Sequence, residues 1–367
     1  MKSFPDSSKS QEIPFSLDLS AVEGRLAPYA ARSGQAVRER PEENCPYRTA
    51  YQRDRDRVLH CRPFRRLAHK TQVFIATLGD HHRTRLTHTL EVSQIARTLA
   101  RCFQVNEDLT EAIALGHDLG HTPFGHAGER ALASLHPGGF NHQTHSLRIV
   151  EKLADGVGLN LTRAVRNGIV NHSKGRGPIF VRGPASPQTV EGQLVRVADI
   201  IAYLAHDLDD ASRAFLVDPQ HMPPDLYKTF GPRASTRIQV MVADLLANSR
   251  TLGRDLVLGF SEAMEKAMEN LRTYLHEKVY THPLLLMELK KGDETIRFIY
   301  EHLLTDDSLL GFLDLSQGER SQAACDFIAG MTDRYAINFG EKLRVGQIAA
   351  FAALPGTSQP ELSACHF

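Results

Sequence analysis

The sequence predicts an all-α fold, on the strength of two helical stripes and one helix cap. The stripes repeat apolar residues at intervals of three and four, as Val92, Ile95, Ala96, Leu99 and Phe103 and as Leu194, Val197, Ile201, Leu204 and Leu208. This spacing places each set on one face of a helix. Asn106, which two acidic residues follow, is typical of the residue that caps a helix start. Alternating strand patterns are scarce, and 179–182 is the one short strand that we expect.

Breaks in the helical pattern divide the chain into three expected regions. Residues 1–50, rich in Pro, Ser, Gly and charge, are expected to form a loose N-terminal arm. Residues 51–220 are expected to form a catalytic helical core, which a Gly- and Pro-rich surface loop interrupts over 173–188. Residues 221–367 are expected to form a C-terminal helical region packed on that core. Its helices are expected near 233–250, 260–282 and 293–313.

Composition sets few limits on function. The 367 residues carry 43 Lys plus Arg and 43 Asp plus Glu, so overall charge indicates neither a nucleic-acid nor a membrane partner. Between residues 51 and 100, however, ten basic residues outnumber four acidic ones, which suggests a basic wall and an anionic substrate. The 5 cysteines form no close pair, and no segment resembles a signal peptide or a membrane span. These features predict a cytoplasmic protein with no membrane contact.

The run GHDLGHTPFGHAGE, from Gly116 to Glu129, is the most informative segment of the chain. Its adjacent His117 and Asp118 offer an imidazole nitrogen and a carboxylate oxygen, which suit a divalent metal ion. A tight metal site generally needs three or four side-chain ligands. His88, in RTRLTHTLEV, and Asp199, in LVRVADIIAYLAHDLDD, are the candidates for the remaining two.

The order His, His-Asp, Asp is the signature of the HD phosphohydrolase superfamily, which this sequence resembles. The match is narrower than the superfamily, because five segments together resemble the deoxyguanosine triphosphate triphosphohydrolase (dGTPase) family, in its shorter dGTPase-like branch. They are RDRDRVLHCRPFRRLAHKTQVF, GDHHRTRLTHTLEVSQIAR, HDLGHTPFGHAGE, GGFNHQTHS and EGQLVRVADIIAYLAHDLDDA. The resemblance spans residues 35–290. It implies an HD-domain helical core with a C-terminal helical extension.

The resemblance also implies a reaction, which is hydrolysis of a deoxynucleoside triphosphate at the α-phosphorus. The products are a deoxynucleoside and intact triphosphate. A divalent ion held by two His and two Asp side chains keeps positions open for water and a phosphate oxygen, and it stabilises charge on the phosphoryl group. This set of ligands is compatible with Mn, Mg, Fe, Co, Ni or Zn.

His126 and Glu129 are the expected catalytic pair. They are three residues apart and so share a face of a helix, which a turn at Pro123–Gly125 is expected to bring back over the metal. We expect His126 to carry the proton and Glu129 to orient it, as the resemblance also implies. The alternative is a surface pair at a helix start. His121 is expected to support a metal ligand or to contact phosphate, and the resemblance implies that His142 lines the site.

Asp199, Tyr203 and Asp207 step by four and so form one stripe of an expected helix. The resemblance implies that Tyr203 stacks on the sugar, where a phenol ring leaves no room for a 2′-hydroxyl. It implies that Asp207 and Gln72 contact the 3′-hydroxyl. The alternative for Tyr203 is an ordinary half-buried aromatic.

Two arginines are candidates for triphosphate binding. The resemblance implies that Arg85 binds phosphate, and the forked guanidinium group suits phosphate oxygens. Arg272 and Tyr280 lie in LRTYLHEKVYTHP, which resembles a family helix with phosphate and base contacts. The sequence departs from the family at Ile200, where some members carry a phosphate-binding lysine. Part of the triphosphate grip therefore comes from elsewhere or is weaker.

Two other functions are compatible with these residues. One is an HD phosphohydrolase that acts on nucleoside monophosphates or cyclic nucleotides, although the arginines and the Tyr203–Asp207 stripe favour a triphosphate. The other is a regulator that binds nucleotide or single-stranded DNA through an inactive site. The complete ligand set and the lack of interleaved aromatic residues in the basic segment argue against it. Family likeness suggests a homo-oligomer, and the sequence leaves a nucleotide effector open.

Overall fold

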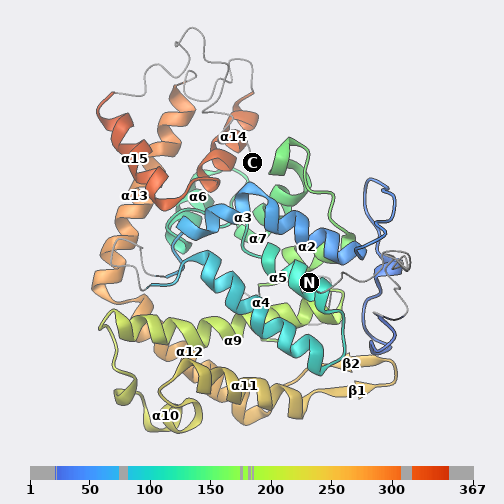
Figure 1. Cartoon of the computed structure of the whole chain (residues 1–367). Coiled ribbons are helices and arrows are strands. Elements are labelled where there is room, and N and C mark those ends of the chain that lie inside the picture. Colours follow the sequence, from blue (N-terminus) through green and yellow to red (C-terminus); the bar gives the residue numbers. More distant parts are fainter. Residues whose placement is uncertain are drawn as a thin grey trace, which may run out of the picture.

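The structure is a computed structural model that describes residues 21, 23–73, 82–173, 177–180, 183, 186–306 and 316–346. The described chain is almost entirely helical (Figure 1), which confirms the predicted fold class. The one sheet within these ranges is an antiparallel hairpin of β1 (Arg250–Leu252) and β2 (Asp255–Val257). No helix in the described chain is long and apolar enough to cross a membrane.

A long helix, α9 (Val190–Arg213), runs through the larger of two hydrophobic cores. The helices that contact it are α4 (Arg85–Cys102), α5 (Glu107–Gly116), α8 (Arg163–Val170), α11 (Ala234–Asn248) and α12 (Glu262–Leu275), and α2 (Ala50–His60) packs on α5. The apolar stripes predicted for α4 and α9 are buried in this core. Their burial explains why helices with ordinary propensities are held in place.

A second, smaller core lies at one end of the molecule, where α13, α14 and α15 lie together beside α6 (Figure 1). These helices are α6 (His126–Leu135), α13 (Pro283–Thr305), α14 (Gln317–Ala329) and α15 (Asp333–Arg344). Phe124 belongs to this second core, whereas Leu119 belongs to the first. The segment between α5 and α6 therefore passes from one core to the other.

Polar caps fix where the helices begin. The Asn106 side chain accepts a hydrogen bond of 3.1 Å from the backbone N–H of Leu109, so the predicted cap of α5 is confirmed. Thr84 and Thr87 form a reciprocal capping box at the start of α4. Such caps satisfy backbone donors that have no partner within the helix. The start of α4 matters for the site, because His88 lies in its first turn.

The prediction of a strand at 179–182 is wrong for the two residues that the structure describes. Ile179 and Phe180 form no strand, and the following two residues lie outside the described ones. The hairpin lies instead at 250–257, where Gly253 has a φ of 63° and allows a tight turn. The helix predicted over 260–282 is α12 followed by a π-helical turn, His276–Tyr280.

Other boundaries differ by part of a helix. The helix expected at 293–313 begins earlier, at Pro283, because proline is tolerated in a first helical turn. Its expected last residues, 307–313, lie outside the described chain. The remaining short helices are α3 (Arg62–Arg66), α7 (His142–Arg148) and α10 (Pro224–Phe230).

The described part of the expected N-terminal arm is packed rather than loose. Arg38 pairs with the buried Asp54 at 2.5 Å, and the Glu23 carboxylate accepts a 2.9 Å hydrogen bond from the Asn106 side chain. These contacts join residues 23–49 to α2 and to the start of α5. Residues 1–20 lie outside the described chain. The boundaries expected at residues 50 and 220 remain predictions.

Candidate metal centre and catalytic residues

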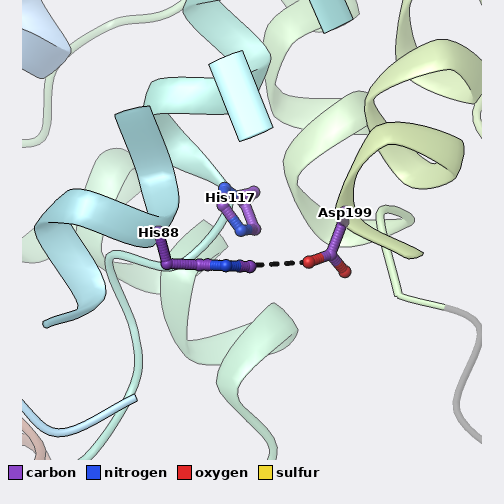
Figure 2. A group of neighbouring side chains, drawn as sticks. All are labelled: His88, His117 and Asp199. Carbon is purple, nitrogen blue, oxygen red and sulfur yellow. Dashed lines mark hydrogen bonds and ion pairs between the residues drawn. The ribbon is translucent and has the colours of Figure 1, made fainter. Parts of the chain in front are cut away.

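His88, His117 and Asp199 converge from three different elements (Figure 2). His88 is in the first turn of α4, His117 follows the last residue of α5, and Asp199 is in the middle of α9. His88 Nε2 lies 3.2 Å from Asp199 Oδ1, and one ligand atom from each residue lies within 4.8 Å of the other two. The packing of α4 and α5 against α9 thus brings together three of the four predicted metal ligands.

The orientation of His117 leaves one ring nitrogen without a partner. Its Nδ1 lies 2.6 Å from the carbonyl oxygen of Ala114, which can only accept, so Nδ1 carries the proton. Its buried Nε2 has no hydrogen-bond partner and faces Asp118 Oδ1 at 3.4 Å. Two acceptors that face each other in a buried site repel unless a cation lies between them. These donors fit a divalent metal ion.

Asp118, the fourth predicted ligand, uses its two oxygens differently. Oδ2 accepts a 2.8 Å hydrogen bond from the guanidinium of Arg85. Oδ1 lies within 3.4 Å of both His117 Nε2 and His121 Nε2. Burial raises the pKa of Asp118. The nearby His117, His121 and Arg85 lower it by more, so that the pKa lies well below its ordinary value. The side chain is therefore an anion, with Oδ1 directed at the imidazoles.

His172 belongs to the same cluster, and the sequence analysis missed it. Its Nδ1 donates to the carbonyl oxygen of Ile169 at 2.6 Å, and its Nε2 lies 3.9 Å from Asp118 Oδ1. Burial lowers the pKa of His172 to about 3, so its imidazole is neutral. It lies two residues after α8, much as His117 follows α5, and this similarity was the available signal. His117, Asp118 and His172 form a second group with metal-ligand spacing.

His126 and Glu129, the predicted catalytic pair, are in contact, and His142 also contacts Glu129. His126 Nδ1 lies 3.0 Å from one oxygen of Glu129, and His142 Nδ1 lies 2.8 Å from the other. The two histidines differ in access, because the His126 side chain is 67% exposed whereas His142 is buried. His142 also stacks on His121, with ring centroids 3.9 Å apart. Asp118, His121 and His142 form a third group with metal-ligand spacing.

Glu129 is held as an anion by these neighbours. Although burial raises the pKa of Glu129, hydrogen bonds with His126 and His142 lower it far below its ordinary value. The backbone N–H of His142 also donates a hydrogen bond of 2.9 Å to Glu129. A fixed carboxylate of this kind can orient an imidazole.

Close packing positions the segment that carries His121 and His126. A Cβ on Gly120 would lie 2.2 Å from the backbone nitrogen of Ser146, so only glycine fits where α7 approaches the segment. Phe124 and Gly125 both have positive φ, 60° and 55°, and their turn redirects the chain into α6. This turn agrees with the one predicted at Pro123–Gly125.

Asp333 of α15 and Lys70 bind the backbone of the segment that carries His121 and Phe124. Asp333 accepts from the backbone N–H of Phe124 at 2.9 Å and from both donors of Thr71. Lys70 donates to the carbonyl oxygens of His121 at 2.5 Å and of Ala329 at 2.8 Å. Burial lowers the pKa of Lys70 to about 7. No local sequence pattern indicates these contacts, and those from Lys70 to Ala329 and from Thr71 to Asp333 join residues about 260 positions apart in the chain.

The residues expected to contact the nucleoside lie further along α9 and beside α12. Tyr280 donates a short hydrogen bond to Asp207, and burial raises the pKa of Asp207 to about 7. Tyr203 is half-buried, and burial raises its pKa, which the nearby charge of Arg272 partly offsets. Gln72 has a buried side-chain oxygen without a partner in the described chain.

The basic segment does not form the expected wall at the metal cluster. Arg53 pairs with Glu42, Arg55 with Asp56, and Arg97 with Glu107. These carboxylates are not part of the cluster, so the pairs are ordinary charged contacts between elements. Arg85 is the arginine of this segment that touches a candidate ligand.

Comparison with known proteins gives consistent matches to this architecture. A family model of the HD domain matches residues 85–204, which include His88 and Asp199, and a model of the phosphohydrolase-associated domain matches residues 258–342. The chain is 49% identical over 317 residues to a deoxyguanosinetriphosphate triphosphohydrolase-like protein of Caldanaerobacter subterraneus subsp. tengcongensis, covering 85% of this chain and 90% of that protein.

Proteins of the same name from two other bacteria are also similar. The one from Desulfatibacillum aliphaticivorans is 44% identical over 330 residues, which are 87% of this chain and 94% of that protein. The one from Clostridium tetani is 38% identical over 326 residues, which are 87% and 91% of the two chains. The protein is therefore a hydrolase of the metal-dependent HD phosphohydrolase type, and the chain belongs to the family of deoxyguanosinetriphosphate triphosphohydrolase-like proteins.

Proposed function

We propose that the protein is a deoxynucleoside triphosphate triphosphohydrolase. Water adds to the α-phosphorus, the bond from that phosphorus to the 5′-oxygen breaks, and the products are a deoxynucleoside and triphosphate. The observation that carries the proposal is the meeting of two unlike sites on one helix, α9. Asp199 of the metal cluster, Tyr203 and Asp207 follow one another along α9 at intervals of four residues, about one turn each. The names of the relatives support the same activity.

We assign the metal to His88, His117, Asp118 and Asp199. The unpartnered Nε2 of His117 and the opposed oxygen of Asp118 support this assignment. A bound divalent ion makes coordinated water more acidic and offsets the charge that develops on the phosphoryl oxygens. His172 holds its Nε2 toward the same carboxylate and keeps that oxygen surrounded by imidazoles.

His126 is assigned to give a proton to the departing 5′-oxygen. Its exposed ring can meet a substrate, whereas His142 is buried against His121. Glu129 holds His126 at Nδ1, which leaves Nε2 directed away as the donor. Glu129, held as an anion, fixes the orientation of the His126 ring, which lets that ring pass a proton to the leaving oxygen.

Sugar and phosphate contacts complete the assignment. Asp207, held by Tyr280, is assigned to the 3′-hydroxyl together with Gln72, and Tyr203 to the face of the deoxyribose. Arg85 is assigned to phosphate in addition to its bond with Asp118, because its Nε is buried and unpartnered. Arg272 remains a candidate for the distal phosphates.

Identification of the products tests this function most directly. The purified full chain is incubated with each dNTP and each ribonucleotide, in turn with Mn²⁺, Mg²⁺, Co²⁺, Ni²⁺, Zn²⁺ and Fe²⁺, and phosphorus NMR follows the products. We expect intact triphosphate from dNTPs and much slower turnover of ribonucleotides. A His117→Ala preparation, purified in the same way, controls for contaminating phosphatases.

Other products would overturn the proposal. Pyrophosphate or orthophosphate as the first product would mean that a different bond is cleaved. Turnover of nucleoside monophosphates or cyclic nucleotides, with dNTPs untouched, would indicate the alternative HD phosphohydrolase. A nucleotide effector, a homo-oligomer and contact with single-stranded DNA remain predictions from the sequence.

A further inference from the structure

A cavity of about 400 Å³ lies beside the first half of α9. Its walls come from the segment between α8 and α9, from α9 itself and from the β1–β2 hairpin. None of the residues that line it is a candidate metal ligand or a member of the His126–Glu129 pair. The cavity is therefore a second candidate site with its own lining residues, and Arg196 lies one helical turn before Asp199 on α9.

Apolar side chains form most of its wall. They include Phe180, Val197, Leu256 and Leu258. The polar side chains of the wall are Ser186, Gln188, Gln193, Arg196 and Asp255, and no ion pair joins Asp255 to Arg196 in the described chain. A concave, mostly apolar surface with a few convergent polar groups is typical of a site for a small organic molecule.

Arg196 is the unusual member of this wall. It is 5% exposed, yet in the described chain it has no hydrogen-bond or ion-pair partner, and its Nε is buried and unsatisfied. Burial lowers its pKa, and no neighbouring carboxylate offsets that effect. An unpaired buried guanidinium is costly, because the charge loses its hydration without a compensating anion.

The other buried arginines of the described chain show what is missing. Arg85 donates to the Asp118 carboxylate at 2.8 Å. Arg237 donates to the carbonyl oxygen of Ala205 at 2.8 and 3.1 Å. Arg196 alone among these three faces a cavity and lacks any such acceptor. No acceptor of the described chain pairs with Arg196, and the cavity that it lines leaves room for one that a ligand supplies.

We propose that this cavity binds a small organic anion, whose carboxylate or phosphate group pairs with Arg196. A guanidinium group presents a planar fork of donors that matches either anion. The apolar body of the ligand packs against Phe180, Leu256 and Leu258, and the amides of Gln188 and Gln193 are available for its polar edge. The apolar walls favour such a ligand over free inorganic phosphate, because phosphate would leave the apolar side chains exposed to water.

Isothermal titration calorimetry tests the site with defined probes. Phenyl phosphate and benzoate supply an apolar ring with a phosphate or a carboxylate, inorganic phosphate supplies the anion alone, and benzyl alcohol supplies the ring alone. The full chain is kept in EDTA, so that phosphate does not bind through a metal. We expect at least one ring-bearing anion to bind, and inorganic phosphate and benzyl alcohol to bind at least tenfold more weakly. Comparison of phenyl phosphate with benzoate identifies which anionic group the site takes.

Three variants locate the binding. Arg196→Met should weaken the ring-bearing anion by at least about tenfold, because its charged hydrogen bonds are lost. Arg254→Met removes an exposed arginine of the same hairpin and should leave binding unchanged. His117→Ala should also leave it unchanged. Equal affinity in wild type and Arg196→Met, or loss of binding in His117→Ala, would overturn the proposal.

Thermal unfolding provides a second test that needs no ligand. If Arg196 is kept for an anion, Arg196→Met removes an unpaired buried charge and should raise Tm in the ligand-free protein. Saturating ligand should raise the Tm of wild type but not of Arg196→Met. A lower Tm for Arg196→Met in the absence of ligand would instead mark the arginine as a structural residue, and the proposal would fail.

Discussion

Two sets of buried polar side chains lie on opposite sides of the segment that joins α5 to α6. On the metal side, Asp118 faces imidazole nitrogens, and His117 Nε2 has no hydrogen-bond partner. On the C-terminal side, Asp333 accepts three hydrogen bonds, from Phe124 and Thr71. Both carboxylates are buried, but only the second is surrounded by neutral donors that satisfy it.

The difference separates a group that holds the fold from a group that awaits a ligand. Buried polar atoms are nearly always hydrogen-bonded, so an unsatisfied one needs an explanation. Asp333 needs none, since its oxygens are occupied by the chain. In the proposed assignment, Asp118 and His117 are complete only when a cation lies between them. Burial and charge alone would not have told the two carboxylates apart.

The largest expected effect tests the metal side directly. His117→Ala should abolish metal binding and turnover together, because it removes a ligand that no neighbour replaces. Elemental analysis of the purified variant and the product assay measure the two effects. His145→Ala is the matched control, since His145 is buried beside Asp326 rather than Asp118. A His117→Ala protein with a full complement of metal would remove this residue from the ligand set.

Glu129→Gln should give the next largest effect. The neutral amide cannot supply the charged hydrogen bond that orients His126, so the rate should fall by about 10²-fold while the metal stays bound. The ratio of kcat to metal content measures this loss. Unchanged turnover in Glu129→Gln would mean that the His126–Glu129 pair is a surface contact.

A smaller effect is expected on the C-terminal side. Thr71 and Phe124 donate to different oxygens of Asp333, and the single amide oxygen of Asp333→Asn cannot accept from both residues, so the hold on Phe124 loosens. We expect kcat to fall by about tenfold, with KM and metal content nearly unchanged. Asp326→Asn is the control, because Asp326 pairs with Arg148 in the same layer without touching the segment. If both variants lose stability but neither loses kcat, Asp333 does not position the catalytic segment.

The smallest effect concerns pH. Burial raises the pKa of Asp207 to about 7 from an ordinary value of 3.8, so the folded protein keeps a proton that the unfolded chain has lost. The resulting stability is complete at low pH and is lost as pH rises through 7. Asp207→Asn should therefore gain Tm relative to wild type between pH 5 and pH 8. The exposed Asp225→Asn should show no such trend; a flat difference for Asp207→Asn would contradict the raised pKa.

Sequence patterns predicted the helices and the first ligands because both depend on local spacing. The stripes of α4 and α9 and the cap at Asn106 are read within a few residues, and both are confirmed. The prediction that His88, His117 and Asp199 lie together depended on the family resemblance. His172 was missed because a lone histidine after a helix has no motif, and its role depends on the packing of α8 against α5 and α9.

The missed features share a physical cause. The β1–β2 hairpin has strands of three residues, and β1 is wholly exposed, so it produces no apolar alternation. Lys70 and Asp333 act through backbone groups, which leave no signature in the identity of the residues that they bind. Only the folded arrangement shows that the phosphohydrolase-associated region contacts the catalytic segment.

That arrangement has a consequence for the newly made protein. The bonds from Lys70 to Ala329 and from Thr71 to Asp333 join an early part of the chain to one of its last helices. As the ribosome releases the chain from its amino end, the four proposed metal ligands emerge long before α15. A nascent protein, or one truncated before residue 316, would carry every catalytic residue yet lack the support that shapes their loop.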